Sequence, residues 1–126
     1  MSFKITNIFV VDDDPMVAAM FADHLKENPL FNVTTFTTGE QCLDNLHLNP
    51  DVIILDYILN SVVPDAAGGL EILHQIRERD KDARVIILSS LDDYGKALQT
   101  IMEGAVEFVV KDENAFARID HILGAK

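Results

Sequence analysis

A short apolar segment that ends on a carboxylate most strongly limits how this chain can fold. Residues 52–55 are consecutive aliphatic residues, and Asp56 follows them directly. An unbroken aliphatic run without polar alternation is typical of a strand that is buried on both faces of a parallel sheet. In open sheets of this kind, ligands and reacting groups lie just beyond the carboxyl ends of the strands. We therefore take Asp56 as the candidate reacting group.

Strand and helix patterns alternate five times along the chain, which predicts the fold class. Apolar and β-branched runs predict strands over residues 5–11, 32–37, 52–56, 85–88 and 108–110. A stretch with helical spacing follows each run. These units predict an α/β fold, in which helices cover both faces of a doubly wound, five-stranded parallel sheet. We expect the flavodoxin-like strand order 2-1-3-4-5, which places the first and third strands side by side.

Helix ends and inward faces follow from the same pattern. Asp14 before Pro15 predicts a capped helix over residues 15–28, and Asp112 is expected to cap the last helix. Apolar residues three or four positions apart predict the faces that turn toward the sheet. They are Val17, Met20, Phe21 and Leu25 in the first helix and Ala97, Leu98 and Ile101 in the fourth.

Composition limits the classes of protein to which this chain can belong. With 126 residues and 48% hydrophobic content, residues 1–126 are expected to form a single domain. The formal net charge of -11 opposes direct binding to nucleic acids or anionic membranes. No segment has the length of a transmembrane helix or the pattern of a signal peptide, and the one cysteine, Cys42, permits no internal disulfide. These features favour a cytoplasmic protein.

Polar side chains end four of the expected strands. Asp12 and Asp13 follow the first strand, Asp56 ends the third, and Ser89 and Lys111 end the fourth and fifth. Because the strands are parallel, we expect these groups to meet at one edge of the sheet. Crowded carboxylates repel unless a proton or a cation joins them, and oxygen ligands favour Mg²⁺ or the similar Mn²⁺. With the ion bound, Asp56 can attack phosphorus, while Lys111 and Ser89 stabilise the charge of the transferred group.

Four motifs together resemble the receiver domain of two-component response regulators. They are Phe9-Val10-Val11-Asp12-Asp13-Asp14-Pro15, Val52-Ile53-Ile54-Leu55-Asp56, Ile86-Ile87-Leu88-Ser89-Ser90 and Gly104-Ala105-Val106-Glu107-Phe108-Val109-Val110-Lys111. The resemblance covers nearly the whole chain. It implies a phosphorylation-dependent signalling switch rather than an enzyme, because such a domain supports only its own phosphorylation and dephosphorylation.

The resemblance also implies a role for each motif residue and a class of partner. The signalling roles fall on Asp56 as phosphoacceptor, Ser89 as switch hydroxyl, Phe108 as switch aromatic and Lys111 as the invariant lysine. The metal ligands fall on Asp12, Asp13, Asp56 and the backbone carbonyl of Ile58. The implied phosphodonor is a sensor histidine kinase or a phosphotransfer protein. The sequence names neither that donor nor the downstream output, and a homodimer is compatible with it.

Two stretches depart from the usual family pattern. Asn60 stands where the family usually has a proline after the acceptor, and the loop that follows runs several residues longer, to Gly68-Gly69. Asp112 replaces the proline that often follows the lysine. Separately, the apolar residues Ile58 and Leu91 occupy positions that in receivers influence the access of water to the phosphoryl group. The resemblance therefore predicts a long-lived phosphate.

Two other functional classes stay open at this point. Residues 9–14 also match the strand-Asp-x-Asp opening of haloacid dehalogenase-like phosphatases, although Met16 stands where Thr or Val is expected and no later acidic motif of that family is present. A degenerate receiver that acts only as a binding module would lack the acceptor, the acid pair or the lysine, all of which occur here. Taken singly, Ser89 and Lys111 could simply end their strands, and Phe108 could be a core residue.

Overall fold

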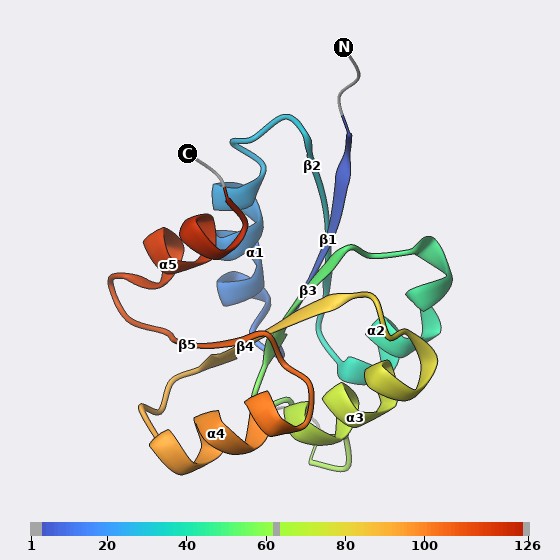
Figure 1. Cartoon of the computed structure of the whole chain (residues 1–126), viewed down its shortest axis with the longest axis vertical. Coiled ribbons are helices and arrows are strands. Elements are labelled where there is room, and N and C mark those ends of the chain that lie inside the picture. Colours follow the sequence, from blue (N-terminus) through green and yellow to red (C-terminus); the bar gives the residue numbers. More distant parts are fainter. Residues whose placement is uncertain (1–3, 62–63, 125–126) are drawn as a thin grey trace.

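The sheet predicted from the sequence is present, with the expected strand order. A computed structural model describes residues 4–61 and 64–124 of the chain. The strands are β1 (Thr6–Val11), β2 (Phe31–Phe36), β3 (Val52–Asp56), β4 (Arg84–Ser89) and β5 (Glu107–Val110). They form one parallel sheet in the order β2-β1-β3-β4-β5 (Figure 1). The predicted fold class and strand order are therefore confirmed.

Helices connect the strands and cover both faces of the sheet. They are α1 (Pro15–Leu25), α2 (Gly39–Asp44), α3 (Gly69–Arg79), α4 (Tyr94–Met102) and α5 (Ala115–Ile122), and a short 3-10 helix, η1, spans Leu46–Leu48. In Figure 1, α1 and α5 lie on one side of the sheet, and α2, α3 and α4 lie on the other. Within the part of the chain that the structure describes, no helix is long and apolar enough to cross a bilayer.

The alternation of side chains along the strands builds one core on each face. Along β3, Ile53 and Leu55 pack into the core that α2 and α3 cover, whereas Val52 and Ile54 pack into the core beneath α1 and α5. All four side chains are almost fully buried. Burial on both sides explains why this strand has no polar alternation in its sequence.

The start of α1 matches the prediction, whereas its inward face and its end differ. Asp14 caps the helix, because its Oδ1 accepts the backbone N–H two residues further on at 3.0 Å. The helix ends at Leu25, earlier than predicted, because the following turn tightens. Met20 was expected to face the sheet but is 54% exposed. The small residues Ala18 and Ala22 take the inward positions instead, which lets the helix pack closely against the strands.

The predicted inward face of α4 is wrong for two of its three residues. Leu98 is 48% exposed and Ile101 is 41% exposed. The buried residue of this helix is Thr100, whose hydroxyl donates to the carbonyl oxygen of Ala97 at 2.9 Å. Because its polar group is satisfied inside the helix, threonine can be buried, and the larger apolar residues remain outside.

The turn before α5 is built differently from the expectation. The helix begins at Ala115, and its N-cap residue is Asn114 rather than Asp112. Asp112 organises the preceding turn: its Oδ1 accepts the backbone N–H of Asn114 at 2.9 Å, and its carbonyl oxygen accepts that of Ala115 at 3.1 Å. A turn separates the strand from the helix, and the Asp112 carboxylate accepts an N–H within that turn instead of capping a helical N–H.

A glycine closes the long connection from β3 to α3. The backbone N–H of Gly69 donates to the carbonyl oxygen of Tyr57 at 2.9 Å. A β-carbon at Gly69 would lie 2.4 Å from the backbone oxygen of Asp56, a separation that only glycine permits. The connection therefore ends against the same strand end from which it starts.

Two substitutions should separate the effect of burial from that of hydrophobicity. We expect Ile54→Ala to lower the free energy of unfolding by about 2–5 kcal/mol, because Ile54 is fully buried and its truncation leaves a cavity. We expect Met20→Ala to change it by less than about 0.5 kcal/mol, because Met20 is largely exposed. Urea unfolding followed by circular dichroism measures both values. A loss for Met20→Ala as large as that for Ile54→Ala would contradict the observed orientation of α1.

Candidate functional site

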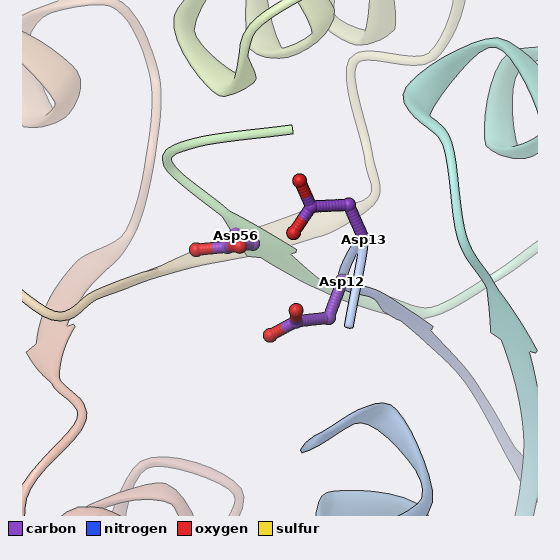
Figure 2. Close-up of side chains that lie close together, drawn as sticks. All are labelled: Asp12, Asp13 and Asp56. Atoms are coloured by element: carbon purple, nitrogen blue, oxygen red, sulfur yellow. The ribbon is translucent and has the colours of Figure 1, made fainter. Parts of the chain in front are cut away.

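Two neighbouring strands bring three carboxylates together. β1 pairs with β3 so that Val11 lies opposite Leu55, and Asp12 and Asp56 consequently leave adjacent strands at the same edge of the sheet. Each of Asp12, Asp13 and Asp56 has a carboxylate oxygen within 4.8 Å of the corresponding atoms of the other two. Figure 2 shows the three side chains gathered at the ends of these strands. The structure thus brings together the three acidic residues that the sequence singled out.

Lys111 joins two of these carboxylates. It directly follows β5, and its backbone N–H donates to the carbonyl oxygen of Ser89 at 2.7 Å. The Nζ atom lies 2.8 Å from Asp12 Oδ2 and 3.1 Å from Asp56 Oδ1. Asp12 is 1% exposed and Asp56 is 5% exposed. The ammonium group therefore offsets negative charge at a place from which water is largely excluded.

Burial and crowding shift the pKa values of the charged groups. Burial, together with the nearby Asp12 charge, raises the pKa of Asp56 to about 6, although Lys111 and the Ile58 backbone act in the opposite direction. Burial alone would lower the pKa of Lys111, but its hydrogen bond to Asp12 and the two carboxylate charges raise that pKa above its ordinary value. One lysine therefore does not fully compensate the buried acidic pair.

Ser89 and Phe108 lie on the two strands beyond β3. Ser89 is buried at the end of β4, and its Oγ accepts the backbone N–H of Leu91 at 3.0 Å. Phe108 is half-buried in β5 and packs against the core beneath α2 and α3. Ile58, two residues beyond Asp56, is exposed. The switch roles of Ser89 and Phe108 and the metal contact of the Ile58 carbonyl stay predictions.

The structure adds one residue that the sequence analysis did not find. The backbone N–H of Ser61 donates to Asp13 Oδ2 at 3.0 Å, and the Ser61 hydroxyl donates to the same oxygen. Ser61 lies in the connection from β3 to α3, 48 positions from Asp13 in the sequence. That connection has no periodic pattern, so the one available signal was its unusual length after the acceptor strand.

The donor set fits a hard divalent cation. Three carboxylates offer only oxygen atoms, which are the ligands that Mg²⁺ and Mn²⁺ prefer. The three carboxylates face one ammonium group, that of Lys111, so negative charge exceeds positive charge in the cluster. A divalent cation among the carboxylates would favour their ionised forms and so lower the raised pKa of Asp56.

The comparisons with known proteins agree on one family. Residues 8–122 match the family model described as the response regulator receiver domain. The chain is 28% identical over 119 residues to the chemotaxis protein CheY of Listeria monocytogenes, covering 94% of this chain and 92% of that protein. Among solved structures, it is similar to the signal receiver domain of a putative Luxo repressor protein from Vibrio parahaemolyticus, with a TM-score of 0.83, 26% identity, and coverage of 95% of this chain and 88% of that one. It is also similar to the response regulator DrrB of Thermotoga maritima, with a TM-score of 0.79 and 32% identity. The match covers 95% of this chain and 53% of the DrrB chain.

Some relatives are much longer than this chain. The match to the transcriptional regulatory protein CitT of Halalkalibacterium halodurans is 28% identical over 109 residues and covers 86% of this chain but 46% of that protein. The match to CheY, by contrast, spans almost the whole of its relative. The part shared with the longer relatives is therefore the domain described above.

The raised pKa of Asp56 predicts a pH-dependent free energy of unfolding when divalent metal ions are removed. The folded protein holds a proton on Asp56 up to about pH 6, whereas the unfolded chain releases it near 3.8. The folded state binds more protons within that interval, so the stability contributed by this group falls as pH rises through it. We therefore expect Asp56→Asn to stabilise the protein near pH 8 and to have little effect near pH 4.

Urea unfolding in a chelating buffer at the two pH values measures this difference. Asp23→Asn is the matched control, because Asp23 is exposed on α1 and lies outside the acidic cluster. An Asp56→Asn effect of the same size at both pH values would contradict the assigned pKa shift.

Proposed function

This chain belongs to the response regulator receiver domain family, and we propose that Asp56 is the residue on which it accepts a phosphoryl group. Receiver domains of this family are phosphorylation-dependent switches of two-component signalling. The observation that carries the assignment is the position of the Lys111 Nζ atom, which contacts both Asp12 and Asp56 at the strand ends. A buried carboxylate beside an ammonium group and two further carboxylates has the surroundings that phosphoryl transfer needs.

In the proposed reaction, a carboxylate oxygen of Asp56 attacks the phosphorus of a phosphohistidine. The P–N bond of the donor breaks, its electron pair stays on the imidazole nitrogen, and a P–O bond to Asp56 forms. Lys111 Nζ lies 3.1 Å from Asp56 Oδ1, so the ammonium group is next to the attacking carboxylate. In the resulting aspartyl phosphate, the ammonium group of Lys111 lies beside the new negative charge and stabilises it.

The proposed metal ion is Mg²⁺ or Mn²⁺. Asp12, Asp13, Asp56 and the backbone carbonyl of Ile58 would hold it, and the cluster of three carboxylate oxygens supports this assignment. When bound, the ion supplies positive charge that offsets the negative charge of the transferred group. The chain itself contributes the fixed positions of the ligands, because Asp12 and Asp56 are attached to paired central strands.

The proposed switch residues are Ser89 and Phe108. The Ser89 hydroxyl oxygen accepts the N–H of Leu91, so turning this hydroxyl toward a phosphoryl group would release the start of the following loop. Phe108, which is half-buried, would then turn further inward. To move such an equilibrium from 1:99 to 99:1, phosphorylation must favour the active form by about 5.5 kcal/mol.

The proposed partners are a sensor histidine kinase or phosphotransfer protein as donor and a separate or attached output module. Relatives are named as transcriptional regulatory proteins and as a DNA-binding transcriptional activator, EvgA of Escherichia coli. We propose that residues 1–126 form a single receiver domain, and the net charge of -11 argues against direct binding of nucleic acid or anionic membranes by this domain. We propose a cytoplasmic location, and a homodimer is compatible with this assignment.

The family match also weighs against the alternatives. A haloacid dehalogenase-like phosphatase is not favoured, because the family model covers residues 8–122 and so includes all four strand ends that carry the candidate residues. A degenerate binding module is not favoured either, since Asp56, the Asp12 and Asp13 pair and Lys111 are all present and close together. The proposed activity is limited to the domain's own phosphorylation and dephosphorylation.

Acetyl phosphate with Mg²⁺ provides the direct test of the acceptor. We expect the intact mass of the wild type to rise by one phosphoryl group, and Asp56→Ala to stay unmodified because the attacking oxygen is missing. Asp14→Asn is the matched control from the same aspartate run, since Asp14 caps α1, and it should be modified like the wild type. A phosphoryl group on Asp56→Ala, or none on the wild type, would overturn the assignment.

Two exposed apolar residues predict the lifetime of the phosphorylated form. Ile58 and Leu91 occupy the positions where receivers control the approach of water, and both are exposed here. We expect the double variant Ile58→Asn, Leu91→Glu to lose its phosphoryl group faster than the wild type, because polar side chains can orient an attacking water. The decay of the phosphorylated mass after removal of acetyl phosphate gives the rate. An unchanged decay rate would contradict this role.

A further inference from the structure

The connection from β3 to α3 touches the acidic cluster through Ser61. Two donors of this residue reach one atom: its backbone N–H lies 3.0 Å from Asp13 Oδ2, and its hydroxyl donates to the same oxygen. Ser61 is otherwise exposed, so no packing against the core explains its place. The contact belongs to the loop that is longer than the family pattern, and it joins that loop to a candidate metal ligand.

The three carboxylates of the cluster are held in different ways. Asp12 accepts the backbone N–H of Asp14 on Oδ1 at 3.0 Å and contacts Lys111 through Oδ2. Asp56 contacts Lys111 through Oδ1 at 3.1 Å. Among the described residues, the hydrogen bonds to the Asp13 side chain come from Ser61 and all go to Oδ2. The orientation of the Asp13 carboxylate therefore depends on the loop.

The loop is also held at its far end. The backbone N–H of Ala67 donates to Glu40 Oε2 of α2 at 3.0 Å, and that of Gly69 donates to the carbonyl oxygen of Tyr57 at 2.9 Å. These bonds tie the loop to α2 and to the end of β3. Ser61 on one side of residues 62–63, and Ala67 and Gly69 on the other, thus all contact the body of the domain.

We propose that Ser61 is a positioning residue for the metal site, because it holds the Asp13 carboxylate with one oxygen turned to the loop and the other left for the cation. This inference rests on the proposed function only in taking Asp13 as a metal ligand. Groups that hydrogen-bond to a ligating carboxylate fix its orientation, and their loss typically weakens metal binding by about 10- to 100-fold. Figure 2 shows one Asp13 carboxylate oxygen directed toward Asp56 and the other away from it.

Metal affinity in four proteins tests the proposal: the wild type, Ser61→Ala, Ser61→Thr and the control Ser90→Ala. Ser90 is an exposed hydroxyl residue just beyond β4. Isothermal titration with Mg²⁺ and electron paramagnetic resonance with Mn²⁺ both report binding without any phosphoryl transfer. We expect Ser61→Ala to bind either ion about tenfold more weakly, at the lower end of the range because its backbone N–H remains. Ser61→Thr should restore most of the affinity, because it restores the hydroxyl, and Ser90→Ala should match the wild type.

The outcomes separate this inference from the assignment of Asp56. An affinity of Ser61→Ala equal to or tighter than that of the wild type would overturn the positioning role, and so would failure of Ser61→Thr to restore affinity. With acetyl phosphate, we expect Ser61→Ala to need more Mg²⁺ for half-maximal phosphorylation but to reach the wild-type rate at saturating Mg²⁺. If the wild type is phosphorylated, and Ser61→Ala and the wild type need the same Mg²⁺ concentration for half-maximal phosphorylation, the positioning role of Ser61 is wrong while the assignment of Asp56 stands. If the wild type is never phosphorylated, the assignment of Asp56 fails, while the binding data still decide the role of Ser61.

Discussion

The contact of one lysine with two buried carboxylates is the interaction on which the arrangement of this site depends. Lys111 Nζ lies 2.8 Å from Asp12 and 3.1 Å from Asp56, although the three groups come from three different strands. Two carboxylates in a nearly dry place repel each other, and without a cation at least one of them would take up a proton. Lys111 offsets these effects only in part, because burial and then the Asp12 charge still raise the pKa of Asp56 to about 6. Three carboxylates face one ammonium group, and this excess of negative charge favours the binding of a divalent cation.

The rest of the fold serves to hold these groups at one edge of the sheet. The strands β1, β3 and β4 are buried on both faces, so their ends cannot shift without opening one of the two cores. At this edge, polar groups replace the aliphatic residues, and the candidate reacting groups stand where packed strands meet solvent. The long loop from β3 to α3 returns at Gly69 to the end of β3 and reaches Asp13 through Ser61. It thus adds a support for the cluster that does not come from a strand.

Errors in the sequence predictions share a physical cause. Periodicity gave the helical character of α1 and α4 correctly, but it does not state how far each helix is rotated about its axis relative to the sheet. Apolar character at helical spacing was the guide to the inward face. It failed where small residues or a hydrogen-bonded threonine pack closer: Ala18 and Ala22 replace Met20, and Thr100 replaces Leu98 and Ile101. The cap assigned to Asp112 failed for a related reason, since the length of a turn depends on how the next helix must dock.

The sequence by itself determined the local features of this protein and the family to which it belongs. Five apolar or β-branched runs were enough to predict the strands, and the common doubly wound layout gave their order. Polar residues at the ends of four of these strands predicted the meeting of Asp12, Asp13, Asp56 and Lys111, because parallel strands leave their ends at one edge. The cap at Asp14 was equally readable, because a cap involves neighbours in the chain. Tertiary structure alone decided the rotation of the helices, the raised pKa of Asp56 and the contact of Ser61 with Asp13. Each of these depends on the distance and dehydration of groups far apart in the sequence, and no local pattern contains that information.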